Sequence, residues 1–132
     1  MTLGGLMKHL ALVQDHYTAT DLTGQPIVAP WDAIDFAAET QWEWRTAADD
    51  SPDELFALWG DAVERSHAAI AAVLADGGLD QPAQSVRGNG EAPNLRDVLT
   101  DLHEEYARHV GHTDLLREAV DGLVGEDPPP RG

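Results

Sequence analysis

The sequence predicts an all-α fold in which a few long helices pack as a bundle. Three stretches carry apolar side chains at helical intervals, and no stretch shows the alternation typical of a strand. These stretches are residues 2–17, 51–78 and 94–120. The last two also begin with helix-capping residues and are followed by glycine, which commonly ends a helix. With 132 residues, the chain is long enough for one domain with one modest core.

The first expected helix runs from Thr2, a suitable N-cap, to about Tyr17. On a helical wheel, its core-facing stripe consists of Leu3, Leu6, Leu10, Val13 and Tyr17. Residues 18–50 contain Gly, Pro and three of the four tryptophans, which predicts a long loop with one short helix. Tryptophans in such a segment more often pack against the core than form a substrate platform.

The other two helices have clearly marked ends. Ser51-Pro52-Asp53-Glu54 has the pattern of a capping box with proline at the first helical position, and Gly77-Gly78 ends that helix. The last helix is expected to begin after Asn94 and to end before Gly122. Its core-facing stripe consists of Val98, Leu99, Leu102, Tyr106, Leu116 and Val120.

Composition excludes several classes of function. Acidic residues outnumber basic ones by 24 to 8, so a formal charge of −16 would repel nucleic acids and anionic membrane surfaces. The chain has no cysteine, so any thiol chemistry must use a thiol from another molecule. Residues 1–17 are too polar for a signal peptide or a membrane span, which predicts a cytoplasmic protein. We expect the bundle to cover residues 1–126 and the proline-rich residues 127–132 to be a disordered tail.

The last helix carries ionisable side chains on its core-facing side. Glu105, His109 and His112 all lie inside or at the edge of the apolar stripe. Burying unpaired charge is costly, so these groups need partners. Their spacings of four and three residues direct them toward a common point, where one divalent metal ion would satisfy all three.

The first helix offers two further histidines, on the flank of its apolar stripe. His9 would complete a metal site with the last helix, whereas His16 is more simply a hydrogen-bonded boundary residue. His67 and His103 lie off the apolar stripes, and we expect them at the surface. The alternative to a metal site is a network of ion pairs in which the last-helix group contacts Arg96, Arg108 or Arg117.

Two segments carry motifs of a known family. In the last helix these are Leu95-Arg96, His103-Glu104-Glu105, Ala107-Arg108-His109, Gly111-His112 and Asp114-Leu115-Leu116-Arg117-Glu118. The opening segment reads Leu3-Gly4-Gly5-Leu6, followed by His9-Leu10. Together they resemble the DinB-like superfamily. More narrowly, they resemble an uncharacterised, mostly actinobacterial branch related to mycothiol-dependent maleylpyruvate isomerases.

This resemblance implies a DinB-like antiparallel helical bundle that binds a divalent metal. One ligand comes from an early helix, here His9. The last helix supplies two more, either Glu105 with His109 or His109 with His112. Zinc or nickel is the expected ion. The superfamily has a helix before the His9 helix, and this chain lacks it. Either the sequence begins too late, or a homodimer completes the bundle, or the protein keeps only three long helices; we expect one of the first two.

Two functions are compatible with these expectations. The first is a metal-dependent transferase or isomerase that uses a low-molecular-weight thiol, with mycothiol as the candidate, and a small electrophilic substrate. The second is a non-catalytic, metal-stabilised or dimeric stress-response binding protein. An enzyme needs an open coordination position and a cleft, whereas a structural site is coordinatively saturated.

Overall fold

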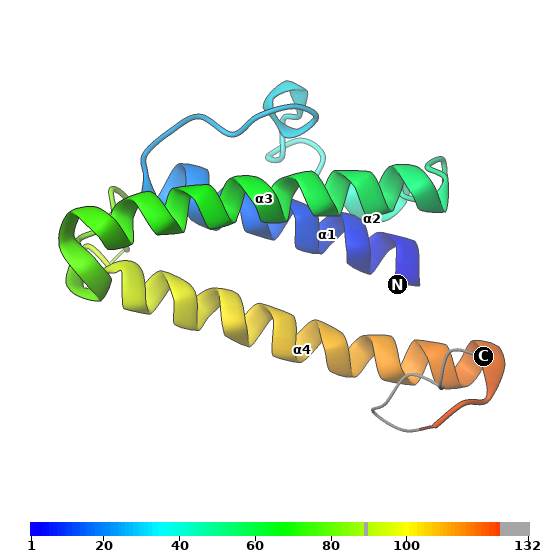
Figure 1. The fold of residues 1–132 in the computed structure, drawn as a ribbon. Helices are drawn as coiled ribbons and strands as arrows, with labels where there is room; N and C mark the ends of the chain where they lie inside the picture. The colour runs from blue at the N-terminus through cyan, green and yellow to red at the C-terminus, as the bar shows by residue number, and fades with distance from the viewer. Residues whose placement is uncertain (89, 125–132) are drawn as a thin grey trace.

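The computed structural model describes residues 1–88 and 90–124, and it confirms the all-α bundle (Figure 1). Its α-helices are α1 (Leu3–Asp15), α2 (Trp42–Thr46), α3 (Pro52–Gly77) and α4 (Leu95–Asp121). A π-helix (His16–Leu22) continues α1, and 3₁₀ turns lie at Trp31–Ala33 and Gly78–Asp80. Within the described residues there is no strand, only an isolated bridge between Pro82 and Asn94. The expected tail, residues 127–132, lies outside the described residues.

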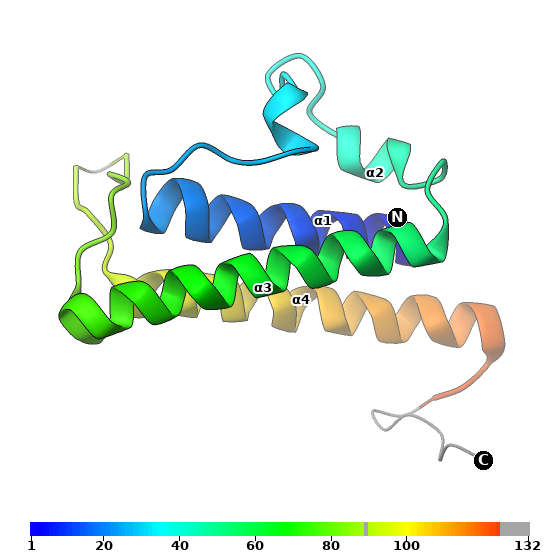
Figure 2. The ribbon, with the colours of Figure 1, turned by 45° about the horizontal axis from the view of Figure 1, so that its top comes forward.

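Three long helices lie side by side, and their directions differ (Figure 1, Figure 2). Residues 23–51, which we call the crossover, carry the chain back to the end at which α1 began. Helix α3 therefore runs parallel to α1, and α4 runs antiparallel to both. The expected antiparallel packing holds for α4 but not for the pair α1 and α3. For α3 to run parallel to α1, the chain must first return along the length of α1, which accounts for the length of the crossover.

The predicted starts of the three long helices and the predicted ends of α3 and α4 are confirmed. Thr2 Oγ1 accepts a hydrogen bond from the backbone N–H of Gly5, at 3.1 Å, and so caps α1. Ser51 and Asn94 each form a complete capping box, at the starts of α3 and α4 respectively. Gly122 adopts a left-handed φ of 72° at the end of α4, a conformation that glycine tolerates without a Cβ clash.

The helical path from α1 is longer than predicted. We expected a loop from residue 18, but the π-helix continues to Leu22, and Thr18 Oγ1 donates to the carbonyl of Gln14 at 2.7 Å. Leu22 is 1% exposed and packs with Leu95 and Val98. Burial of this leucine between α3 and α4 outweighs the nearby turn signals, so the predicted loop start is wrong.

The crossover is packed by its aromatic side chains, as predicted. It contains the 3₁₀ turn and α2 and no other helix among its residues. Trp31 is 1% exposed and lies in a core cluster with Ala11 of α1 and Ala62 of α3. The crossover is therefore part of the core and not a peripheral loop.

The second half of α4 is less buried than predicted. Its buried apolar residues, Leu95, Val98 and Leu102, all lie in the first turns, and His109 is the sole buried residue after them. Val120, which we placed in the core-facing stripe, is 78% exposed. The last turns of α4 extend past the start of α1, so none of the other described helices covers the apolar stripe there (Figure 1).

The apolar side chains at the start of α1 are also only partly covered by other elements. The resemblance to the DinB-like superfamily implied a missing helix at this place. Leu6 is 2% exposed, but Leu3 is 41% exposed. Leu3 and Leu10 line an apolar pocket of about 560 Å³ between α1, α3 and α4. The apolar stripe of α1 is thus only partly covered by the described residues.

Candidate metal centre

Helix α1 places His9 in the space between α1, α2 and α4. The His9 side chain is 20% exposed, and its two ring nitrogens face two different carboxylates. Nδ1 lies 3.1 Å from Glu43 Oε1 on α2, and Nε2 lies 4.0 Å from Glu105 Oε2 on α4. A carboxylate only accepts hydrogen bonds, so the Glu43 contact requires the proton on Nδ1 and leaves the Nε2 lone pair facing α4.

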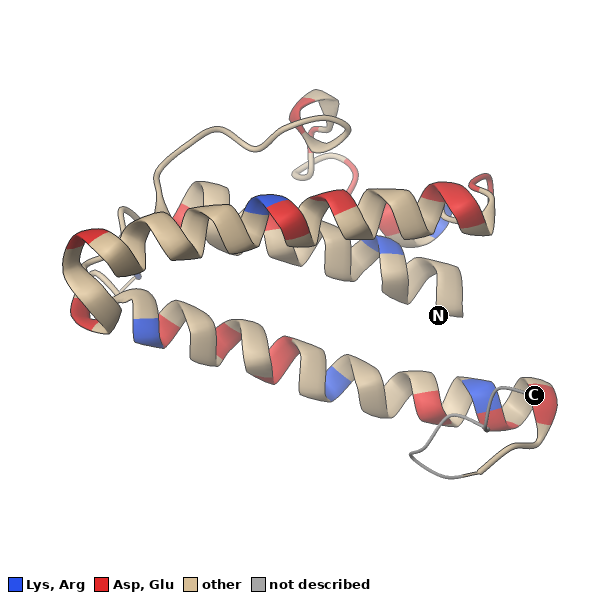
Figure 3. Cartoon of the chain, in the orientation of Figure 1, with Lys and Arg blue, Asp and Glu red and all other residues tan. Residues whose placement is uncertain are grey.

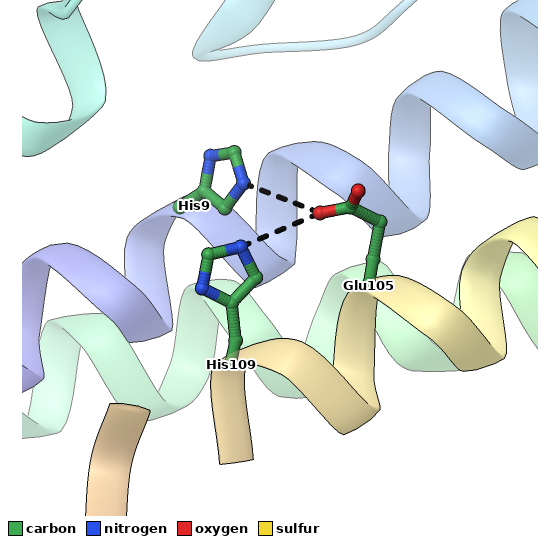
Figure 4. A group of neighbouring side chains, drawn as sticks. All are labelled: His9, Glu105 and His109. Atoms are coloured by element: carbon green, nitrogen blue, oxygen red, sulfur yellow. Dashed lines mark ion pairs between the residues drawn. The ribbon is translucent and has the colours of Figure 1, made fainter. Parts of the chain in front are cut away.

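Helix α4 supplies Glu105 and His109, one turn apart on the face that points to His9 (Figure 4). Glu105 Oε2 lies 3.3 Å from His109 Nε2, and His109 is 6% exposed. One ligand atom from each of His9, Glu105 and His109 lies within 4.8 Å of the others. Two imidazole nitrogens and one carboxylate oxygen at this spacing form a donor set suited to zinc or nickel.

His112 lies beside His109 and outside this group of three. Its Nδ1 is 3.3 Å from His109 Nδ1, on the opposite side of the His109 ring from Glu105. One of these two nitrogens must donate to the other. If His109 donates from Nδ1, its Nε2 keeps a lone pair on the side of His9 and Glu105.

The alternative network of ion pairs is present only in part. Arg108 forms an ion pair with Glu105 through Oε1, while Oε2 faces the two histidines. Arg96 instead pairs with an aspartate at 3.2 Å, and Arg117 pairs with another at 3.5 Å, and neither contacts the group. Arginine therefore occupies one oxygen of Glu105 and leaves the other facing the two histidines.

Sequence reasoning missed the contribution of α2. Glu43 is 4% exposed, and its second oxygen, Oε2, is buried with no partner among the described residues. Trp44 stacks on the His9 ring with centroids 4.6 Å apart and an interplanar angle of 26°. An acidic residue between two tryptophans was the available signal, but no periodicity in the crossover shows which helix these side chains meet.

Burial and neighbouring charges shift the pKa of His109 in the centre and of Tyr17, which feels the charge of Glu105. Burial lowers the pKa of His109, and the nearby His9 lowers it further, although Glu105 opposes the change. His109 is therefore neutral at pH 7, which is the form that binds a metal. Burial, and secondly the charge of Glu105, raises the pKa of Tyr17, so its phenol keeps its proton.

The remaining histidines lie apart from the centre. His67 and His103 are exposed, as predicted. The His16 side chain is 54% exposed, and its Nε2 lies 3.8 Å from Asp21 Oδ2, which agrees with a boundary residue. The structure thus brings together His9, Glu105 and His109 from helices that are distant in the sequence.

Comparison with known proteins bears on what such a centre does. A family model described as mycothiol-S-transferase matches residues 1–122. The chain belongs to the mycothiol-S-transferase family. This family is part of the DinB-like superfamily, so the resemblance seen in the sequence is confirmed at that level, and the narrower actinobacterial branch stays a prediction. No curated protein and no solved structure matches the chain.

Membership of the mycothiol-S-transferase family supports a mycothiol-related transferase function in general and a small-molecule thiol as substrate. The chain has no cysteine, so the sulfur of any thiol chemistry must come from another molecule. Among the helices described, none is both long and apolar enough to cross a membrane.

Proposed function

We propose that this protein is a metal-dependent mycothiol S-transferase in which His9, Glu105 and His109 bind the ion. The observation that carries the proposal is the approach of three ligand atoms to within 4.8 Å of one another. They come from α1 and α4, so the fold itself, and not a local turn, brings them together. A divalent ion supplies Lewis acidity that lowers the pKa of a bound thiol and so favours the nucleophilic thiolate at neutral pH.

The protein's own residues prepare the site for such an ion. Glu43 accepts from His9 Nδ1 and so directs the Nε2 lone pair toward Glu105. Trp44 stacks on the same ring and holds its plane. His112 orients His109 when it accepts from His109 Nδ1. Lone pairs from both imidazoles then face the same point as Glu105 Oε2.

The donor set favours an enzyme over a saturated structural site. Three protein ligands leave a fourth position of a tetrahedral ion open, which is the arrangement typical of catalytic zinc. The fourth candidate, His112, has its Nδ1 on the far side of the His109 ring from Glu105. We therefore assign it the role of orienting His109 and not that of a fourth ligand.

Metal analysis of purified variants tests the proposal. We expect the wild-type protein to bind one equivalent of zinc or nickel, and His9→Gln and His109→Gln to lose it. His67→Gln is the matched control, because it removes an exposed histidine on α3. Transfer of mycothiol to an electrophile should stop with the ion removed by chelator and return on its addition. Full metal binding by His109→Gln, or activity that persists without metal, would overturn the proposal.

A further inference from the structure

A second cavity lies against the candidate metal centre, between α1 and the crossover. It has a volume of about 440 Å³, and His9 forms part of its wall. Apolar side chains form most of the rest: Leu12, Val13, Ile27, Trp31, Ile34 and Phe36. We call this cavity the apolar chamber. Its volume lies in the range of small-molecule sites in proteins.

The crossover wall of the chamber is held in place by a buried polar contact. Trp31 Nε1 donates to Asp15 Oδ2 at 2.8 Å, and Asp15 is 2% exposed. Arg65 of α3 donates to both oxygens of the same carboxylate, each at 2.9 Å. Three elements thus meet at one carboxylate, and the chamber is a built feature of the fold and not a gap beside a loose loop.

The chemistry of the wall selects an uncharged ligand. Of the described lining residues, Asp32 alone has a formal charge at pH 7, and no Lys or Arg is among them. Acidic residues outnumber basic ones along the chain, including the crossover, which disfavours the approach of anions (Figure 3). A charged group would also lose its hydration against the aliphatic and aromatic side chains.

The chamber shares a residue with the candidate centre, and the larger pocket at the start of α1 does not. The described lining of that larger pocket includes none of His9, Glu105 and His109. In the apolar chamber, His9 belongs both to the wall and to the group of three. A molecule in the chamber would therefore contact His9, one of the three residues that would hold the ion.

We propose that the apolar chamber binds the carbon skeleton of the electrophile, and that this electrophile is an uncharged alkyl or arylalkyl compound such as a benzyl halide. This inference rests on the proposed function. In the reaction, the thiol sulfur forms a bond to the benzylic carbon, the halide leaves with the electron pair of the broken bond, and the thiol proton passes to solvent. The products are a thioether, a halide ion and a proton.

Binding is testable without metal or thiol, because the chain has no cysteine. Ile34→Cys introduces a single thiol in the chamber wall, and Val28→Cys introduces one at a crossover position that is 40% exposed and outside the lining. Each variant is alkylated with a polar maleimide, with and without saturating toluene. We expect toluene to slow alkylation of the Ile34→Cys variant about tenfold and to leave the Val28→Cys variant unchanged. Equal effects on both variants, or none on either, would overturn the binding site.

The role in catalysis is tested separately with the metal-loaded protein. Ile34→Asp should raise KM for benzyl bromide by about tenfold while KM for mycothiol is unchanged, because an aspartate in the wall disfavours the apolar skeleton. Val28→Asp is the matched control and should change neither constant. If toluene protects the Ile34→Cys variant from alkylation but the wild type has no transferase activity, the proposed function is refuted and the binding site is not. Protection with an unchanged KM in Ile34→Asp would refute the chamber as the electrophile site.

Discussion

The ring of His9 has different partners at its two nitrogens, and this asymmetry makes Glu43 a positioning residue for metal binding. Replacing Glu43 with Gln keeps a hydrogen-bond acceptor but removes the negative charge next to Nδ1. We expect the zinc affinity of Glu43→Gln to fall by about 10- to 100-fold, measured by competition with a chromophoric chelator. The spectrum of the cobalt-substituted variant should also change, because His9 becomes a weaker donor.

Glu39→Gln is the control for this prediction. It removes a carboxylate from the same segment, and its ion-pair partner is Arg45 and not His9. The role of Glu43 is disproved if Glu43→Gln and Glu39→Gln bind zinc equally well.

Asp15 is the residue that connects the crossover to α3, through Trp31 and Arg65. Asp15→Ala removes the acceptor of Trp31 Nε1 and of both Arg65 donors. We expect the free energy of unfolding to fall by about 2 to 3 kcal/mol, since hydrogen bonds to a buried charge are lost and Trp31 keeps an unpaired N–H. Urea denaturation measures this loss. Asp32→Ala, at an exposed position of the crossover, should change it little; a similar loss there would contradict the assignment.

For individual residues, the sequence predicted part of the candidate metal site. Helical periodicity placed Glu105 and His109 on one face of one helix and His9 on the flank of another, and the structure brings these three together. Glu43 and Trp44 could not be predicted, because their contacts depend on where the crossover lies in space and not on any repeat. The ligand roles themselves stay a prediction until metal is measured.

Among the elements, α3 shows most directly how local sequence determines a helix boundary. Ser51 Oγ accepts from the backbone N–H of Glu54, and the Glu54 carboxylate accepts from the backbone N–H of Ser51. We expect Ser51→Ala to lower the free energy of unfolding by about 1 kcal/mol in urea titrations at neutral pH. Thr40→Ala, at an exposed crossover position, serves as the control.

The effect of Ser51→Ala should depend on pH. Hydrogen bonds from Ser51, first from its backbone and then from its side chain, lower the pKa of Glu54 in the folded protein. Stability from this contact is therefore present above the unfolded-state pKa of Glu54 and is lost as pH falls through the lower, folded-state pKa. The difference between wild type and Ser51→Ala should shrink over that acidic range. Because Ser51→Ala keeps the backbone hydrogen bond to Glu54 and removes only the one from the hydroxyl, a constant difference would show that the hydroxyl does not stabilise the Glu54 carboxylate.

The elements that the sequence predicted well are those with local signals. Caps and glycines mark both ends of α3 and α4, and the structure confirms them. The π-helix to Leu22 was missed because its cause is burial against Leu95, a contact between distant segments. Exposure of Val120 was missed because periodicity shows which face of a helix is apolar but not how far along the helix a partner extends.

For the whole molecule, metal binding and folding should be linked. An ion bound only by the folded state stabilises it by about 2.7 kcal/mol at a free concentration one hundred times its Kd. We expect zinc to raise the free energy of unfolding of the wild type and of His67→Gln by this amount in urea denaturation. His109→Gln should show no such increase, and a zinc-induced increase in that variant would place the ion elsewhere.

The uneven burial of α4 has a consequence for dynamics. Its apolar anchors all lie before residue 103, whereas Glu105 and His109 lie beyond them. Backbone amides in the later turns should therefore exchange with deuterium through local opening, faster than those near Leu95 and without global unfolding. An ion bound by His9, Glu105 and His109 would connect these turns to α1. Metal binding would therefore slow the exchange and hold the later turns of α4 against the metal centre.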